Sequence, residues 1–243
     1  MSPISQRLDH PGIYANCVED IDLVASVILS YDSEDLDMIQ NYQYKNDLNL
    51  NKSLKFGFVR GPVWNFGDED MKNGIEEFVK NSQLDIEELD LGKDFEDAAK
   101  AHEIIMNGSI ANSLINYYQA DKSMLHPFTV KRIEAGIPVS ASDYVSAIEK
   151  AKKMEKILRQ LFLKYDSIIT PAAPGQAPRD LMNTGNAIFN GYWTMMGVPA
   201  ISLPFLKGRD NLPIGIQFIA NWNEDLKLLE ICKEVLKKEK LAD

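Results

Sequence analysis

The sequence predicts an α/β fold with a mixed central sheet and helices on both of its faces. Of the 243 residues, 45% are hydrophobic, which is enough to bury one sizeable core. Short apolar segments that end at Gly or Pro alternate with longer segments whose apolar residues recur at helical spacing. A strand, a helix and a second strand follow one another over residues 54–91, as in a βαβ unit.

The first predicted element is a helix over residues 16–30. Asn16 and Glu19 have the spacing of a capping box, and apolar residues follow at intervals of three and four positions. These apolar residues are Val18, Ile21, Val24, Ala25 and Ile28. Residues 31–52 are polar and rich in Asp and Asn, whose side chains compete for local backbone hydrogen bonds. We therefore expect a polar surface connection over 31–52.

The βαβ unit is predicted to begin with a strand over residues 54–60, which ends at the turn Gly61-Pro62. An amphipathic helix follows over residues 69–82. In residues 84–91 apolar and acidic residues alternate, which indicates the second strand.

Two long helices are predicted over residues 95–118 and 143–165, the second with Ser142 as its N-cap. The interval between them, residues 119–140, contains two prolines and a glycine, and we expect a loop there.

Three further strands are predicted over residues 167–171, 199–205 and 213–219, and a last amphipathic helix over 223–240. The longest uncharged run, residues 181–206, raises the question of a membrane span. It contains Asn, Gly and Pro residues that are costly in lipid, so we interpret it as a helix followed by a buried strand.

Charge and cysteine content exclude several functions. The formal net charge is -10, on which a general phosphate-binding surface is hard to build, so nucleic acid is not an expected partner. Cys17 and Cys232 lie at opposite ends of the chain and form neither a metal-binding spacing nor a disulfide framework. The first residues do not resemble a secretory signal. We expect a cytoplasmic protein with no metal, no cofactor and no membrane contact.

Five blocks of residues, in order along the chain, carry a family resemblance. They are Leu8-Asp-His-Pro-Gly12 with Ala15 and Val18-Glu-Asp20, Asp166-Ser-Ile-Ile-Thr-Pro171 with Pro174 and Ala177-Pro178, Thr184-Gly-Asn-Ala-Ile-Phe-Asn190 with Trp193, Gly197-Val-Pro-Ala-Ile-Ser-Leu-Pro204, and Leu212-Pro-Ile-Gly-Ile-Gln-Phe-Ile219. Together they resemble the C-terminal half of the amidase-signature family, the serine amidohydrolases. The resemblance implies hydrolysis of a carboxamide through an acyl-serine intermediate, with no cofactor.

The resemblance also implies that the reacting groups lie elsewhere. The family's nucleophilic serine, a second serine on a cis peptide bond and a lysine precede the block that corresponds to residues 8–12. Residues 1–243 contain no Gly-Gly-Ser loop, so we expect a single partial amidase-signature domain with no catalytic residue of its own and no activity without an upstream half. Three interpretations stay open, namely one half of an enzyme, a truncated-gene remnant, and a non-enzymatic α/β binding or assembly module.

The resemblance places Thr184, Asn186 and Asn190 close to the family's catalytic cleft, and we predict that they bind substrate. Asn186 departs from the family pattern, which usually has Asp there. Thr184 has an alternative role as a helix N-cap. The expected partners are a small amide substrate and either a complementing N-terminal subunit or a second copy of the chain.

Other candidate sites in the sequence have weaker support. The pair Gly108-Ser109 lies in a helical segment and lacks the G-x-S-x-G pattern of a nucleophile elbow. Asp9 and His10 are adjacent in a loop, so we expect a structural turn. The three histidines, His10, His102 and His126, are too scattered in sequence to indicate a zinc site.

Overall fold

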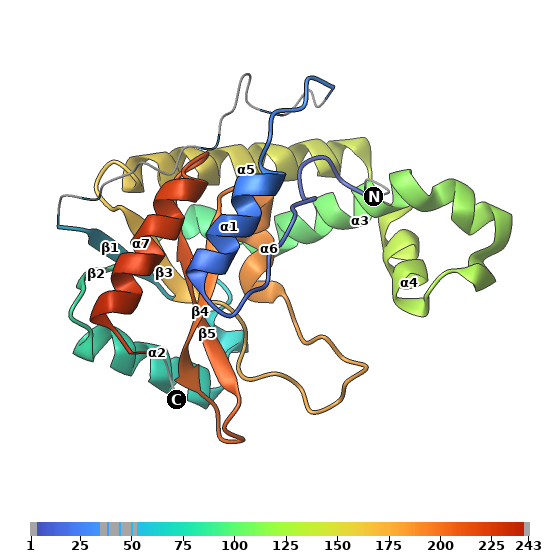
Figure 1. Cartoon of the computed structure of the whole chain (residues 1–243). Coiled ribbons are helices and arrows are strands. Elements are labelled where there is room, and N and C mark those ends of the chain that lie inside the picture. Colours follow the sequence, from blue (N-terminus) through green and yellow to red (C-terminus); the bar gives the residue numbers. More distant parts are fainter. Residues whose placement is uncertain (1–3, 35–37, 39–43, 45–49, 51–52, 241–243) are drawn as a thin grey trace.

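The structure is a computed structural model that describes residues 4–34, 38, 44, 50 and 53–240. Most of the polar connection predicted over residues 31–52 lies outside the described residues. Figure 1 shows the chain, with strands in the centre and helices around them.

The described residues form one five-stranded sheet with the order β2-β1-β3-β5-β4. Its strands are β1 (Lys55–Val59), β2 (Asp85–Leu89), β3 (Ser167–Pro171), β4 (Ala200–Lys207) and β5 (Pro213–Ile219). Strand β1 pairs in parallel with β2 and β3, whereas β5 pairs in antiparallel fashion with β3 and β4. The predicted mixed sheet is therefore confirmed.

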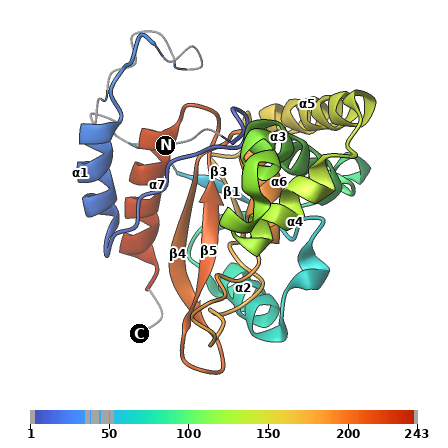
Figure 2. The same ribbon diagram turned by 90° about the vertical axis from the view of Figure 1, so that its right-hand side faces the viewer.

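Helices cover both faces of this sheet, as predicted (Figure 2). On one face lie α1 (Val18–Ile28) and α7 (Asp225–Lys238), which contact each other. The other face is covered by α3 (Ala98–Asp121), α5 (Ala141–Leu161) and α6 (Ile188–Met196).

Helix α2 (Glu69–Asn81) connects the parallel strands β1 and β2, which confirms the predicted βαβ unit. It begins at Asp68, whose Oδ1 accepts a hydrogen bond from the N–H of Met71 at 2.8 Å. Met71 and Ile75 on its inner face are fully buried in the core. The strands, the helix cap and the apolar face of the helix thus all favour the same βαβ unit.

The loop predicted over residues 119–140 was wrong in part, because α4 (Pro127–Gly136) lies within it. Pro127 occupies the first turn of this helix, where a missing N–H costs nothing, and His126 Nδ1 accepts a hydrogen bond from the N–H of Phe128 at 3.2 Å. From the sequence alone this proline suggests the end of a helix, but in the structure it lies at the beginning of one.

Two predicted N-caps were also wrong. Helix α5 begins two residues earlier than expected, and its cap is Ser140, whose Oγ accepts a hydrogen bond from the N–H of Asp143 at 3.0 Å. Ser142 lies in the first turn instead. Helix α1 is preceded by Cys17 with no side-chain cap, so Asn16 and Glu19 do not form the predicted capping box.

The uncharged run over residues 181–206 contains helix α6 and most of strand β4, which confirms the predicted order. The strand is not fully buried, however, since Ala200, Ser202 and Pro204 are exposed and only the opposite face enters the core. Among the described residues, no helix combines the length and the apolar character that a membrane span requires.

Candidate functional site

A cavity of about 850 Å³ contains all three residues predicted to bind substrate. Thr184, Asn186 and Asn190 line it together with the loop that follows β3, the beginning of α6, and the exposed face of β4 and β5. The long loop between β3 and α6 extends to the right of β4 and β5 in Figure 1 and forms the outer wall. We call this cavity the amide pocket, after the Asn and Gln side chains in its wall.

Two short turns shape the segment that carries Thr184 and Asn186. Asn183 Oδ1 accepts a hydrogen bond from the N–H of Gly185 at 2.9 Å, and Asn186 Oδ1 accepts one from the N–H of Ile188 at 3.0 Å. Gly185 has a φ of 84°, which favours glycine. The position before α6 is held by Ala187 with no side-chain cap, so the alternative role of Thr184 as N-cap was wrong.

The sheet forms the inner wall of the amide pocket. A Cβ at Gly215 would come 2.1 Å from Ser202 Oγ, so only glycine leaves this wall its present shape. Gln217 is buried, and its Nε2 donates hydrogen bonds to the carbonyl oxygens of Pro171 at 3.2 Å and Phe189 at 3.5 Å. This side chain ties β5 to the end of β3 and to α6, and it thereby holds the helix that carries Asn190 against the sheet.

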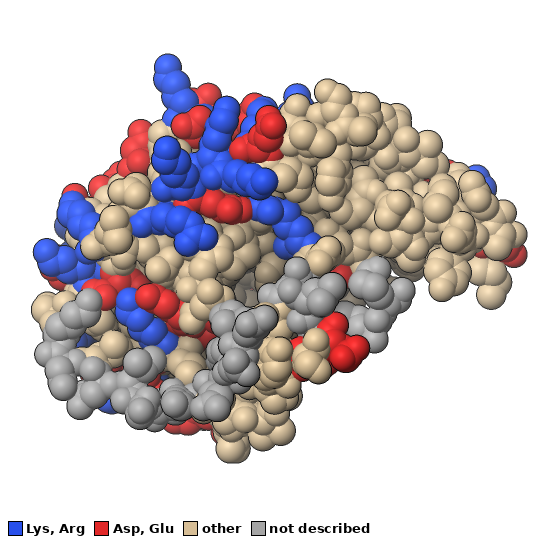
Figure 3. All heavy atoms as spheres, turned by 90° about the horizontal axis from the view of Figure 1, so that it is seen from above, with Lys and Arg blue, Asp and Glu red and all other residues tan. Residues whose placement is uncertain are grey.

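Among the described residues, no Asp, Glu, Lys, Arg or His lines the amide pocket. Its polar groups are the amides and hydroxyls of Asn, Gln, Thr and Ser side chains. Charged side chains are exposed elsewhere, for example Lys152, Lys156 and Arg159 of α5. Figure 3 shows Lys and Arg side chains gathered over one part of the face seen from above. The site is therefore suited to an uncharged polar ligand, because a buried charge without a partner is costly.

Ion pairs fix the rim of the pocket. Arg209 Nε lies 3.0 Å from Asp70 Oδ2 and Arg179 pairs with Asp210, so that the β4–β5 turn is joined to α2 and to the loop after β3. Hydrogen bonds from Arg209 lower the pKa of Asp70, and the Arg179 guanidinium lowers that of Asp210. Gln176, which lines the pocket, accepts a hydrogen bond from the N–H of Asp210 at 3.1 Å.

Three buried polar atoms lie in the core around α6. Thr170 Oγ1, Tyr192 Oη and Trp193 Nε1 are fully buried, and the Tyr192 hydroxyl lies next to the other two groups. Burial raises the pKa of Tyr192, so its phenol is neutral at physiological pH. Trp193 is 1% exposed and borders the amide pocket, which makes it part of the core as well as of the pocket wall.

His102 is a residue near the site that the sequence did not identify. A Cβ at Gly191 would come 2.7 Å from Nδ1 of this imidazole, so the ring packs against the residue next to Asn190. Burial, and secondarily the charge of Arg132, lower the pKa of His102 and favour the neutral ring. No sequence motif marks a histidine in such a position. Within the described part of the chain, no group of three or more His, Cys, Asp or Glu residues could hold a metal ion.

Fold and site together define a class, namely mixed α/β proteins with an uncharged polar pocket between the central sheet and the helix before its edge strand. Within that class the family is shown by the sequence itself. The chain belongs to the Amidase family, whose model matches residues 1–229. The resemblance seen in the sequence motifs is thereby confirmed.

Curated relatives extend well beyond the matched region. The chain is 28% identical to a glutamyl-tRNA(Gln) amidotransferase subunit of Aliarcobacter butzleri, over 93% of this chain and 57% of the relative. It is 27% identical to the subunit of the same name from Agathobacter rectalis, over 88% of this chain and 50% of the relative. The chain thus spans about half the length of these curated relatives.

Solved structures share the fold. A protein complex described as vestigial, which reveals the evolutionary origins of an s-triazine catabolic enzyme, matches with a TM-score of 0.84 at 21% identity, over 99% of this chain and 55% of that one. The glutamyl-tRNA(Gln) amidotransferase subunit of Thermotoga maritima matches with a TM-score of 0.73 at 20% identity, over 99% and 55%. The predicted fold class is confirmed by these neighbours.

Proposed function

We propose that residues 1–243 supply the substrate-binding portion of an amidase that hydrolyses a carboxamide through an acyl-serine intermediate. The observation that carries this proposal is the amide pocket, into which Thr184, Asn186 and Asn190 all fall within a chain of the Amidase family. In this proposal the catalytic serines and lysine belong to a complementing N-terminal half, and the chain is inactive without it.

The neutral lining suits an uncharged carboxamide. An Asn amide offers both a donor N–H and an acceptor oxygen, which complements the carbonyl oxygen and the NH₂ group of the substrate. Asn186 Oδ1 is already engaged with the N–H of Ile188, so its Nδ2 is the group left to donate. Asn190 and Thr184 complete the polar side of the pocket.

The reaction has two steps. The serine hydroxyl of the complementing half attacks the substrate carbonyl and gives its proton to the leaving nitrogen. The bond between the carbonyl carbon and the nitrogen breaks, ammonia departs, and an acyl-serine ester remains. Water then attacks the ester, and the carboxylic acid and the serine hydroxyl are released. The role of Thr184, Asn186 and Asn190 is to hold the amide in the orientation that the attack requires.

The proposed setting is the cytoplasm, with a complementing N-terminal polypeptide or a second copy of the chain as protein partner and without nucleic acid. A non-enzymatic binding or assembly module is the second candidate. The preserved amide pocket fits both, since a pocket that binds amides needs no nucleophile.

Coexpression tests the proposal. The reading frame upstream of the Met1 codon is expressed with the full chain, and ammonia release is measured from acetamide, an aryl amide and glutamine. We expect turnover from the pair and none from the chain alone, with turnover lost in the pair when Asn190 is replaced by Ala. Turnover by the chain alone that Ser109→Ala abolishes would contradict the assignment of catalysis to another half. An inactive pair would favour the binding module.

A further inference from the structure

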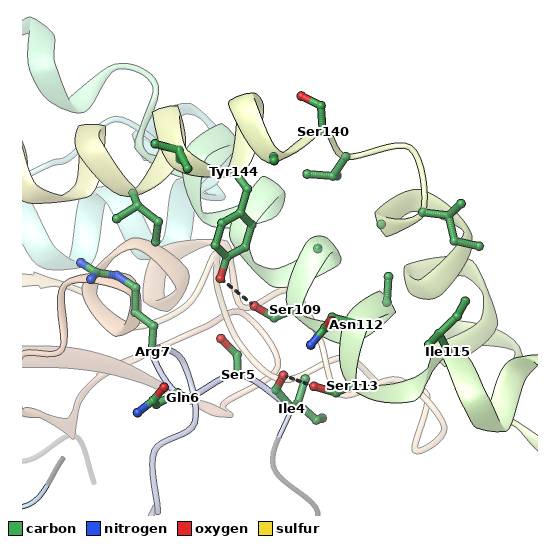
Figure 4. A pocket seen from close by; sticks show the side chains of 18 residues that line it. Ile4, Ser5, Gln6, Arg7, Ser109, Asn112, Ser113, Ile115, Ser140 and Tyr144 are labelled. Atoms are coloured by element: carbon green, nitrogen blue, oxygen red, sulfur yellow. Dashed lines mark hydrogen bonds between the residues drawn. The ribbon is translucent and has the colours of Figure 1, made fainter. Parts of the chain in front are cut away.

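We propose that a second cavity, separate from the amide pocket, binds an uncharged molecule that carries a carboxamide-like group on an apolar arm. This cavity of about 1080 Å³ lies between α3, the beginning of α5 and the N-terminal segment 4–7 (Figure 4). We call it the hydroxyl pocket. Within the described residues it shares no lining residue with the amide pocket, and the proposal does not depend on the proposed amidase function.

Four polar side chains from three elements converge in the hydroxyl pocket. Ser109 Oγ of α3 and Tyr144 Oη of α5 are hydrogen-bonded at 3.2 Å. Ser5 in the N-terminal segment is 6% exposed, and Figure 4 shows its hydroxyl directed toward this pair. The amide of Asn112 points to the same region. A planar group with both a donor and an acceptor, such as a carboxamide, matches such a set.

Most of the remaining lining is apolar, while Gln6, Arg7, Ser113 and Ser140 add polar side chains. The apolar part includes Ala111, Ile115, Ile137, Val139, Val145 and Ile148. Ile137 and Val145 are 54% and 55% exposed, so they stand at the rim where a ligand would enter. A mainly apolar cavity with a few convergent polar groups is the usual form of a small-molecule site. The apolar walls call for an arm of several carbon atoms attached to the polar group.

The charge of the lining restricts the ligand to uncharged molecules. Among the described lining residues, Arg7 alone carries a permanent charge; its Nη2 pairs with Glu155, and its Nε is buried with no hydrogen-bond partner among the described residues. None of the other described side chains in this lining is Asp, Glu, Lys or His. An ammonium group would therefore lose its hydration without gaining a partner of opposite charge, and a carboxylate would meet in Arg7 a guanidinium whose charge Glu155 already balances.

Close contacts hold the pocket in its open form. A Cβ at Gly108 would come 3.0 Å from Cδ2 of Tyr144, so glycine lets the tyrosine ring lie directly on α3. The N-terminal segment is attached by Ser113, whose Oγ donates to the carbonyl oxygen of Ile4 at 2.8 Å. Asp9 Oδ2 accepts a hydrogen bond from the N–H of Ile4 at 2.8 Å, so Asp9 has the structural role in a turn that is expected from the sequence. Ligand binding then needs little reorganisation.

Three molecules of one shape and different charge test the proposal on the full chain. Hexanamide, hexanoate and hexylammonium are titrated near neutral pH, and binding is followed by backbone amide NMR shifts. We expect hexanamide to shift resonances in residues 108–113 and 140–145, and to bind at least about tenfold more tightly than either ion. Ser109→Ala and Tyr144→Phe each weaken hexanamide binding about three- to tenfold.

Two controls separate this pocket from the other one and from unfolding. Ser146→Ala removes an exposed hydroxyl of α5 that does not line the pocket, and it leaves affinity unchanged. Asn186→Ala alters the amide pocket and also leaves hexanamide binding at residues 108–145 unchanged, whatever it does to hydrolysis by the complemented enzyme. Melting curves identify any variant that fails to fold. Equal binding of hexanoate, shifts confined to the amide pocket, no binding, or unaltered affinity in folded Tyr144→Phe would each overturn the proposal.

Discussion

The two pockets are built in different ways. The amide pocket is built largely around one continuous segment, in which the side chains of Asn183 and Asn186 fix local turns, and against a sheet face that Gly215 leaves bare. The hydroxyl pocket is shaped by side chains that meet from distant parts of the sequence, such as Ser113 with the carbonyl of Ile4. Local turn chemistry leaves a motif in the sequence, whereas a meeting of distant side chains does not. The amide pocket was predicted because the family resemblance marks residues 184–190, whereas no motif marks the side chains that meet in the hydroxyl pocket.

Truncation of Trp193, which borders the amide pocket, is the largest effect expected from the comparison. This side chain is 1% exposed within the core, so Trp193→Ala should lower the free energy of unfolding by about 3–5 kcal/mol. Val145→Ala at the exposed rim of the hydroxyl pocket should change it by less than about 0.5 kcal/mol. Urea denaturation of both variants measures this. Comparable losses in the two would show that the rim is part of the core.

A pair of glycine variants compares how far the wall of each pocket can yield. A Cβ at Gly136 would come 1.9 Å from the backbone oxygen of Asn107, whereas a Cβ at Gly215 meets the movable side chain of Ser202. We expect Gly136→Ala to cost about 3 kcal/mol of unfolding free energy and Gly215→Ala about 1–2 kcal/mol.

Ser202→Ala provides the matched rescue for the sheet wall. It removes the Oγ that the new methyl group at position 215 would meet, so the double variant should recover most of the loss. The same substitution should do nothing for Gly136→Ala, because the two sites share no partner. Thermal melts of the single and double variants decide this, and strict additivity at 202 and 215 would refute the contact.

Much of the fold was predictable because the spacing of apolar residues along the sequence matches the positions that are buried in the core. Sheet, βαβ unit and the helix-strand order over residues 181–206 follow from apolar spacing that the core also requires. Helix α4 was missed because proline at a first turn and proline as a breaker look alike until the chain on either side is placed. The choice between Ser140 and Ser142 as cap likewise depends on where α5 packs, since either serine satisfies the local rule.

Three residues that line the amide pocket were predictable from the sequence, but their contacts were not. Thr184, Asn186 and Asn190 lie together as one lining, yet the turn formed by Asn186 and the approach of His102 to Gly191 require coordinates. Asn186 illustrates the difference. From sequence it is predicted only to bind substrate, whereas the structure gives its Oδ1 a structural role at the beginning of α6.

Variants of Asn186 separate these two roles. Asn186→Ala removes the acceptor for the N–H of Ile188 and should cost about 0.5–2 kcal/mol of unfolding free energy, as the loss of a capping side chain does. Asn186→Asp keeps the acceptor and places negative charge near the beginning of α6, so stability should be retained or raised by about 0.3–1 kcal/mol. Chemical denaturation measures both. If the Asp variant loses as much as the Ala variant, the Asx turn does not stabilise α6.

The smallest expected effect concerns His102 and its pH dependence. Burial against α6 lowers the pKa of this imidazole below its value in the unfolded chain, which is about 6.5. The unfolded state therefore takes up a proton first as pH falls, so the stability contributed by the neutral ring is complete above about pH 6.5 and declines as pH falls below it. His102→Gln should remove this dependence of the unfolding free energy on pH between about pH 7 and pH 5. The Asp70–Arg209 and Asp210–Arg179 pairs change stability only at lower pH, because the pKa of each of these carboxyls is lowered. Unfolding free energies of both proteins across that range give the test. Parallel curves would mean that burial against α6 does not desolvate His102.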